Sequence, residues 1–99
     1  MKPKWKIHED KLAKEFKGKK RPGSGSQWNK GGDILSSTYL IEAKQTDKKS
    51  YSINLKTWRK IYNEALFSYR LPLLSLKIQE TELVILSKDD FLSLIKYTP

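Results

Sequence analysis

The sequence contains no cysteine and only one histidine, His8, among its 99 residues. Disulfide scaffolds, thiol chemistry and cysteine-based zinc or iron–sulfur sites are therefore excluded, and a cluster of histidine ligands cannot form. We expect His8 at the surface. No uninterrupted apolar run approaches the roughly 20 residues that a membrane-spanning helix needs, and the lysine-rich beginning lacks the apolar stretch of a secretion signal. These absences predict a cytoplasmic protein with no membrane partner.

Negative charge is also scarce, because eleven acidic residues stand against twenty lysines and arginines and leave a net charge of +9. The excess is concentrated in residues 1–31, where ten basic and three acidic residues give +7, whereas residues 32–99 carry +2. Such a concentration favours a nucleic acid partner, bound through phosphate contacts and counterion release. The alternative is a solvated lysine surface without a partner.

Hydrophobic patterning predicts short helices and strands within a single domain that covers residues 1–99. The domain comprises a basic helix with a Gly/Ser loop (1–32), a hairpin (33–44) and a helix with closing strands (45–99). This order predicts an α/β fold with a small mixed β-sheet flanked by helices. The expected elements are a helix over 7–17, strands over 33–35 and 39–44, a brief strand or arm at 51–53, a helix over 54–69, strands over 73–78 and 83–86, and a short helix from a cap at Ser87 to about 96.

Residues 18–32 are rich in glycine, serine and lysine, which predicts an irregular loop. The loop matches neither GxxxxGK[ST] nor a GxGxxG that opens a helix, so no nucleotide cofactor is expected. Its basic and hydroxyl side chains, and two lysines that follow the hairpin, are suited to contact nucleic acid phosphates. The expected DNA-binding residues are Lys19, Lys20, Arg21, Ser24, Lys30, Lys48 and Lys49.

Two acids and a lysine lie at positions that a hairpin would bring together. Asp33 opens the first strand, and Glu42 and Lys44 share one face of the second, because side chains alternate along a strand. Clustered carboxylates raise one another's pKa unless a divalent cation neutralises them, and all-oxygen ligation suits Mg²⁺, with Mn²⁺ as a substitute. Lys44 could orient or help deprotonate a water, and the Ala43 carbonyl could supply a further ligand. The set predicts metal-assisted hydrolysis of a phosphodiester.

Glu9 stands out for a different reason, which is its place on the apolar side of the first helix. It lies three and seven residues before Leu12 and Phe16, so the three side chains share one helical face. A carboxylate that faces a core is costly unless something compensates it. The plain alternative is an ion pair between Glu9 and a neighbouring lysine.

Asp33 followed by Glu42-Ala43-Lys44 resembles the PD-(D/E)xK nuclease core, with Gly32 in the place where the motif usually has proline. The run Arg21-Pro22-Gly23-Ser24-Gly25-Ser26 ahead of Asp33 is similar to archaeal Holliday junction resolvases and their phage-encoded relatives. The resemblance covers about residues 7–78. It implies a restriction-endonuclease-like core and a homodimer that cuts four-way DNA junctions symmetrically with the help of Mg²⁺.

The resemblance also implies roles for individual residues. Metal ligation falls to Glu9, Asp33 and Glu42, with the Ala43 carbonyl from the argument above, and catalysis involves Glu9, Asp33, Glu42, Lys44 and Ser26, while Arg21 contributes to DNA cleavage. Two alternatives stay open. The same catalytic core could act on another DNA structure, such as a flap or a nick, or the chain could be a basic DNA-binding protein whose carboxylates are structural.

Overall fold

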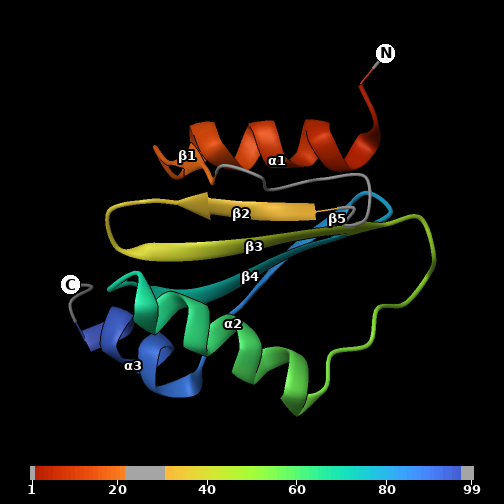
Figure 1. The fold of residues 1–99 in the computed structure, drawn as a ribbon. Helices are drawn as coiled ribbons and strands as arrows, with labels where there is room; N and C mark the ends of the chain where they lie inside the picture. Colours follow the sequence, from red (N-terminus) through yellow and green to blue (C-terminus); the bar gives the residue numbers. More distant parts are fainter. Residues whose placement is uncertain (1, 22–30, 97–99) are drawn as a thin grey trace.

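The computed structural model describes residues 2–21 and 31–96, which form three helices and five strands (Figure 1). The predicted α/β fold, a small mixed sheet flanked by helices, is confirmed at this level of detail. The elements follow in the order α1 (Lys4–Glu15), β1 (Lys19–Lys20), β2 (Gly31–Leu35), β3 (Tyr39–Thr46), α2 (Leu55–Phe67), β4 (Leu71–Ile78), β5 (Thr81–Ile85) and α3 (Lys88–Lys96).

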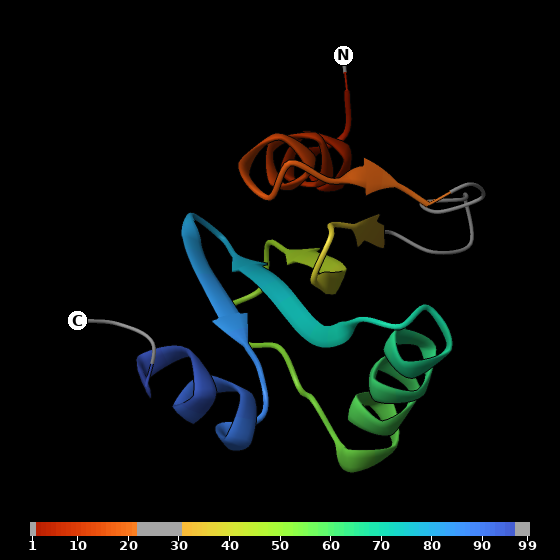
Figure 2. The same ribbon diagram turned by 90° about the vertical axis from the view of Figure 1, so that its left-hand side faces the viewer.

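The five strands form one sheet in the order β1-β2-β3-β4-β5. Neighbouring strands are antiparallel except β3 and β4, which run parallel and are joined by α2 as the crossover that such a pair requires. Figure 2 shows α1 on one face of this sheet and both α2 and α3 on the other. The alternation of side chains along β2, β3 and β4 therefore decides which residues meet which helix.

The face toward α1 is apolar. Leu12 of α1 packs in a buried cluster with Ile34, Ile41, Ala43 and Leu73 of the sheet. Successive side chains of a strand point to opposite faces, so Glu42, which lies between two members of this cluster, points to the face that α2 covers. That assignment places the acidic residues of the hairpin on the α2 side of the sheet.

The face toward α2 is apolar as well, apart from those acids. Leu40 and Leu74 of the sheet and Ile61 and Ala65 of α2 are buried. The helix begins as expected after Asn54, whose side-chain oxygen accepts a hydrogen bond from the Thr57 backbone N–H at 2.8 Å. Among the residues described, no helix has the length and apolar character needed to cross a membrane.

The structure corrects three local expectations. Residues 19–20 form the short strand β1 rather than part of an irregular loop. Of the two expectations for residues 51–53, a brief strand or an arm, the strand is excluded, since these residues lie outside any strand. The first helix begins at Lys4, earlier than expected. His8 lies one turn before Leu12 and therefore shares the side of the helix that faces the sheet. His8 is accordingly buried, with 2% of its surface exposed, so its expected surface position is wrong.

Candidate metal centre and nucleic-acid interface

The hairpin brings Asp33 and Glu42 directly opposite each other. They are register partners in the antiparallel pair of β2 and β3, and directly opposed residues project on the same side of a sheet, with Cβ atoms about 4.5–5.5 Å apart. The expected proximity of these two carboxylates is thus confirmed, and its cause is the three-residue turn at 36–38. Ser36 holds this turn, since its hydroxyl accepts a hydrogen bond from the Tyr39 N–H at 2.8 Å.

A third carboxylate, which the sequence did not reveal, reaches the same place from α2. Oxygen atoms of Asp33, Glu42 and Glu64 all lie within 4.8 Å of one another, close enough to share a cation. These three residues are called the acid cluster below. Glu64 follows the buried Ile61 by three positions and precedes the buried Ala65 by one, so it borders the sheet-facing stripe of α2. The only sign of this role in the sequence is the position of Glu64 beside the apolar stripe of its helix.

Glu42 is the most perturbed acid of the cluster. Its side chain is only 13% exposed. Burial, followed by the hydrogen bond and the negative charge of Asp33, raises the pKa of Glu42 to about 8, against the opposing effect of Lys44. The Lys44 Nζ atom lies 3.1 Å from the Glu42 carboxylate. Two close carboxylates with one lysine beside them form an electrostatically strained set, which a divalent cation would relieve.

A small cavity adjoins the cluster on its α2 side. It has a volume of about 60 Å³ and is lined by Glu42, Lys44 and Glu64 together with Lys60 and Tyr51, among others. A space of this size holds only a few water molecules. Because two acids of the cluster and two lysines face it, the cavity brings together a place for water, a candidate base and positive charge.

Arg21 occupies the acid cluster in this structure. Its Nη1 atom lies 2.9 Å from the Asp33 carboxylate and 3.7 Å from that of Glu64. The Arg21 backbone N–H also donates a hydrogen bond to the Asp33 carbonyl at 3.0 Å, which continues the pairing of β1 with β2. The residue predicted to contact DNA therefore supplies positive charge to the acids, at the position where a cation would compensate them.

Glu9 lies apart from the acid cluster. It is buried on the sheet-facing side of α1, as expected, with 2% of its surface exposed, but this helix covers the opposite face of the sheet from the one that bears Glu42. Burial raises the pKa of Glu9, and Lys20 opposes this effect with its Nζ atom 3.8 Å away. The structure thus shows the ion pair named as the plain alternative and does not include Glu9 in the cluster.

Ala43 also contributes to the α1 side. Its methyl group is buried in the cluster around Leu12, and its backbone lies on β3, which pairs with β2 on one side and β4 on the other. The Ala43 carbonyl consequently lies in the plane of the sheet, where amide groups of the neighbouring strands compete for it.

The lysines predicted to bind DNA are placed differently from one another. Lys19 is exposed, whereas Lys20 forms ion pairs with Asp10 and Glu9. Lys48 and Lys49 are exposed directly after β3. Ser24, Ser26 and Lys30, which were also predicted to act in binding or cleavage, lie outside the described residues.

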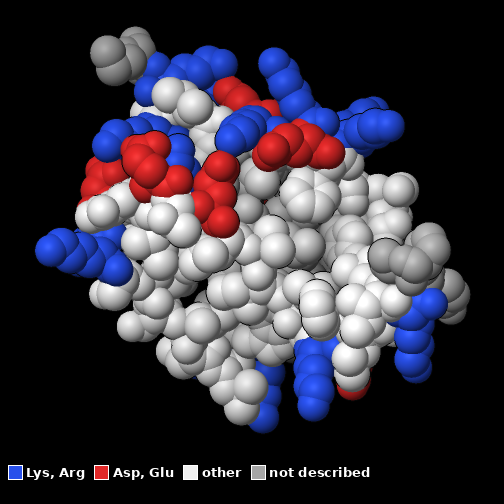
Figure 3. Space-filling model, turned by 180° about the vertical axis from the view of Figure 1, so that it is seen from behind, with Lys and Arg blue, Asp and Glu red and all other residues white. Residues whose placement is uncertain are grey.

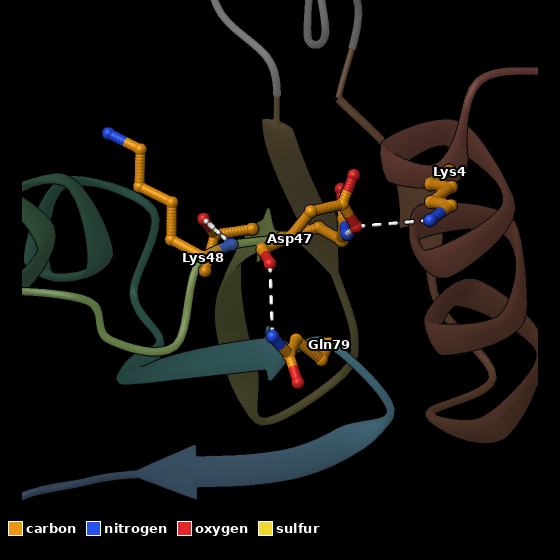
Figure 4. Close-up of polar contacts among 6 residues, drawn as sticks. Lys4, Asp47, Lys48 and Gln79 are labelled. Atoms are coloured by element: carbon orange, nitrogen blue, oxygen red, sulfur yellow. Dashed lines mark hydrogen bonds and ion pairs between the residues drawn. The ribbon is translucent and has the colours of Figure 1, made fainter.

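Figure 4 shows how Lys48 is presented. Asp47 anchors the end of β3, since its carboxylate lies 3.1 Å from the Nζ atom of Lys4 and its backbone carbonyl accepts a hydrogen bond from Gln79 at 3.2 Å. The Lys48 backbone N–H donates to Thr46, while the Lys48 side chain extends away from these contacts. A held backbone with an extended ammonium group is suited to a phosphate contact.

His8 is a buried polar residue on the α1 side of the sheet. Its Nδ1 atom lies 3.8 Å from the Glu82 carboxylate on β5, which also pairs with Lys11 at 2.9 Å. Burial lowers the pKa of His8 in spite of the nearby acid. The residue belongs to the packing of α1 on the sheet and lies on the opposite side from the acid cluster.

Comparisons of the chain with known protein families, with curated proteins and with solved structures found no match.

Proposed function

We propose that the protein is a metal-dependent, structure-selective endodeoxyribonuclease of the PD-(D/E)xK type that resolves four-way DNA junctions. One observation carries the proposal, namely the convergence of Asp33, Glu42 and Glu64 within 4.8 Å beside a lysine. The arrangement of a hairpin that bears the acids, followed by a helical crossover to a parallel strand, supports a restriction-endonuclease-like core.

The donor set of the acid cluster fits Mg²⁺ or Mn²⁺. All three side chains offer carboxylate oxygens, which these hard cations prefer. Burial and the neighbouring Asp33 carboxylate raise the pKa of Glu42 in spite of Lys44, so a cation would stabilise its charged form. Asp33, Glu42 and Glu64 would therefore hold the cation, with Arg21 displaced from Asp33.

A bound divalent cation supplies a Lewis acid that polarises the scissile phosphate and neutralises charge that develops on it. The chain itself positions the reactants. Lys44, held 3.1 Å from Glu42, can donate a hydrogen bond to a phosphate oxygen or orient the attacking water within the adjoining cavity. Because Glu42 would hold the cation, the role of helping to deprotonate that water falls to Lys44. Arg21, once released from the acids, adds a bidentate donor for phosphate.

The positive charge of the chain suits a DNA backbone. We expect exposed lysines such as Lys19, Lys48 and Lys49 to contact backbone phosphates, so recognition should follow the shape of the DNA more than its sequence. Affinity should fall steeply as salt rises, because bound lysines release counterions from the phosphates. Symmetrical cutting of a junction also requires two active sites, and thus a homodimer. A cytoplasmic location belongs to the same proposal.

A panel of labelled DNAs tests the proposal against its two alternatives. Wild type and Asp33→Asn are each incubated in Mg²⁺ with a four-way junction, a flap, a nicked duplex and a linear duplex. The proposal expects paired cuts on the junction that Asp33→Asn abolishes while binding persists. Preferred cutting of the flap or the nicked DNA would support the same catalytic core with another substrate. Binding without cleavage of any DNA would indicate a binding protein.

A further inference from the structure

The last helix leaves an apolar surface without cover. None of the residues of α3 is buried, and the helix makes only sparse contacts with the rest of the described chain. Phe91, Leu92 and Ile95 have between 38% and 51% of their surface exposed. These three residues lie within about 100° of one another around the helix axis, so they form one continuous stripe.

An exposed apolar residue of the edge strand β5 lies on the same side of the sheet as α3 (Figure 2). Leu83 of β5 is 44% exposed and is the register partner of Leu76, which points to the face that α2 and α3 cover. Figure 3 looks at the side of the molecule that bears β5 and α3 and shows charged groups crowded at the top and a broad uncharged region below them. The surface formed by Leu83, Phe91, Leu92 and Ile95 is called the α3 face below.

The size of the α3 face suits a modest protein interface. An aromatic side chain buries about 150–250 Å² and an aliphatic one less, so these four residues, 38–51% exposed, leave on the order of 300 Å² of apolar surface uncovered. An apolar patch of a few hundred Å² is often functional. With a polar rim it approaches the roughly 800 Å² per partner of a stable interface.

The charges that border the stripe favour a second copy of this chain as the occupant. Asp89 and Lys96 are seven residues apart, so they lie two turns apart on the same flank of the stripe. In a two-fold arrangement each contact occurs twice, with residue i of one copy meeting residue j of the other and the reverse. Antiparallel α3 helices would therefore set Asp89 of each copy against Lys96 of the other. Lys88 would approach the carboxyl end of the opposing helix, where positive charge is favourable.

We propose that two copies of the protein associate through the α3 face, with their α3 helices antiparallel across a two-fold axis and with reciprocal pairing of Asp89 and Lys96. The inference stands on the exposure and charge pattern of α3 and does not require the nuclease. If both hold, the association supplies the second active site that symmetrical cleavage needs.

Charge reversal tests this geometry directly. Sedimentation equilibrium gives the dimer dissociation constant of wild type, Asp89→Lys, Lys96→Glu and the double variant, with circular dichroism to verify that each is folded. Each single reversal sets like charges against each other in both symmetry-related pairs and should weaken association at least tenfold. The double variant restores both pairs and should recover the wild-type constant within about threefold. An equimolar mixture of the two single variants should form a heterodimer. Lys14→Glu, a reversal at an exposed position of α1 on the other face of the sheet, serves as the control.

Several outcomes would overturn the inference. They are a wild-type protein that remains monomeric at about 100 μM, a dimer that Phe91→Ser leaves intact, or single reversals that weaken the dimer without rescue by the double variant. The last result would indicate another arrangement of the α3 face or another partner for it. None of these variants touches the acid cluster, so loss of the dimer and loss of phosphodiester cleavage are separate readouts. A monomer that still nicks DNA in Mg²⁺ would refute the dimer and leave the nuclease standing.

Discussion

Replacement of Glu42 by glutamine should make the protein more stable at alkaline pH. Glutamine has the same shape, can accept a hydrogen bond from Lys44 and can donate one to Asp33, but it carries no charge. In the wild type, the side chain is 13% exposed and lies beside another carboxylate. The substitution therefore removes the electrostatic repulsion while it preserves the packing between β3 and α2.

The size and sign of the effect follow from the pKa of Glu42, which rises from 4.5 to about 8 on folding. Between these values the folded state holds a proton that the unfolded state has released, so the free energy of unfolding falls as pH rises. The stabilisation that this proton gives to the folded state is fully present below pH 4.5 and is lost by about pH 8. At about 1.4 kcal/mol per pH unit, the whole interval has a ceiling on the order of 5 kcal/mol. In Glu42→Gln the side chain does not titrate, so the free energy of unfolding does not fall in this way as pH rises.

Urea denaturation in EDTA at several pH values between 4.5 and 8.5 measures the effect. The difference in unfolding free energy between Glu42→Gln and wild type should grow in favour of the variant by at least about 2 kcal/mol across this range. Glu80→Gln, in the exposed turn between β4 and β5, is the matched control and should show no such growth. Parallel pH profiles of Glu42→Gln and wild type would refute the assignment of a buried, repelled carboxylate at this position.

Three further substitutions follow from the same geometry. Glu64→Gln should weaken Mn²⁺ binding roughly tenfold in isothermal titration calorimetry, because it removes one of three charged ligands; an unchanged affinity would exclude Glu64 from the site. Arg21→Gln should strengthen Mn²⁺ binding several-fold in the same assay, since the guanidinium competes for the acids, and weaker binding would contradict that competition. Gly18→Ala should lower the free energy of unfolding by about 1–3 kcal/mol, because a Cβ atom would lie 2.7 Å from the Ile34 side chain and 2.8 Å from the Leu35 carbonyl. Urea denaturation measures this loss, and an unchanged free energy of unfolding would show that the backbone around Gly18 relaxes freely.

Local signals in the sequence were sufficient for the hairpin and for the helix that follows it. Alternation of apolar and charged residues determines which side of β3 faces α1, and a three-residue turn then sets Asp33 opposite Glu42. Asn54 predicted the start of α2 because N-caps act over only three residues. These features depend on neighbours in the chain, so pattern and propensity predict them.

The remaining features depend on contacts between distant segments. Glu64 joins the acid cluster only because α2 crosses over the face that bears Glu42, and no motif links the two positions. Arg21 reaches Asp33 through β1, a two-residue strand too short to have a periodic pattern. His8 was misplaced although it lies four residues before Leu12 on the expected helix, because a lone polar side chain gives no sign that the sheet and Glu82 of β5 will cover it. The early start of α1 was missed because Pro3 holds the cap position without a side-chain hydrogen bond. Glu9 was placed on the correct helical face, but the sequence could not show which face of the sheet this helix covers.

The most direct test of the central claim compares cleavage of a single labelled four-way junction in Mg²⁺ and in EDTA, by wild type and by Glu42→Ala. We expect symmetrical paired nicks by wild type in Mg²⁺, no cleavage in EDTA, and no cleavage by Glu42→Ala in either buffer. Equal cleavage by wild type with and without Mg²⁺, or undiminished cleavage by Glu42→Ala, would contradict the assignment of the acid cluster as a metal-dependent hydrolytic site.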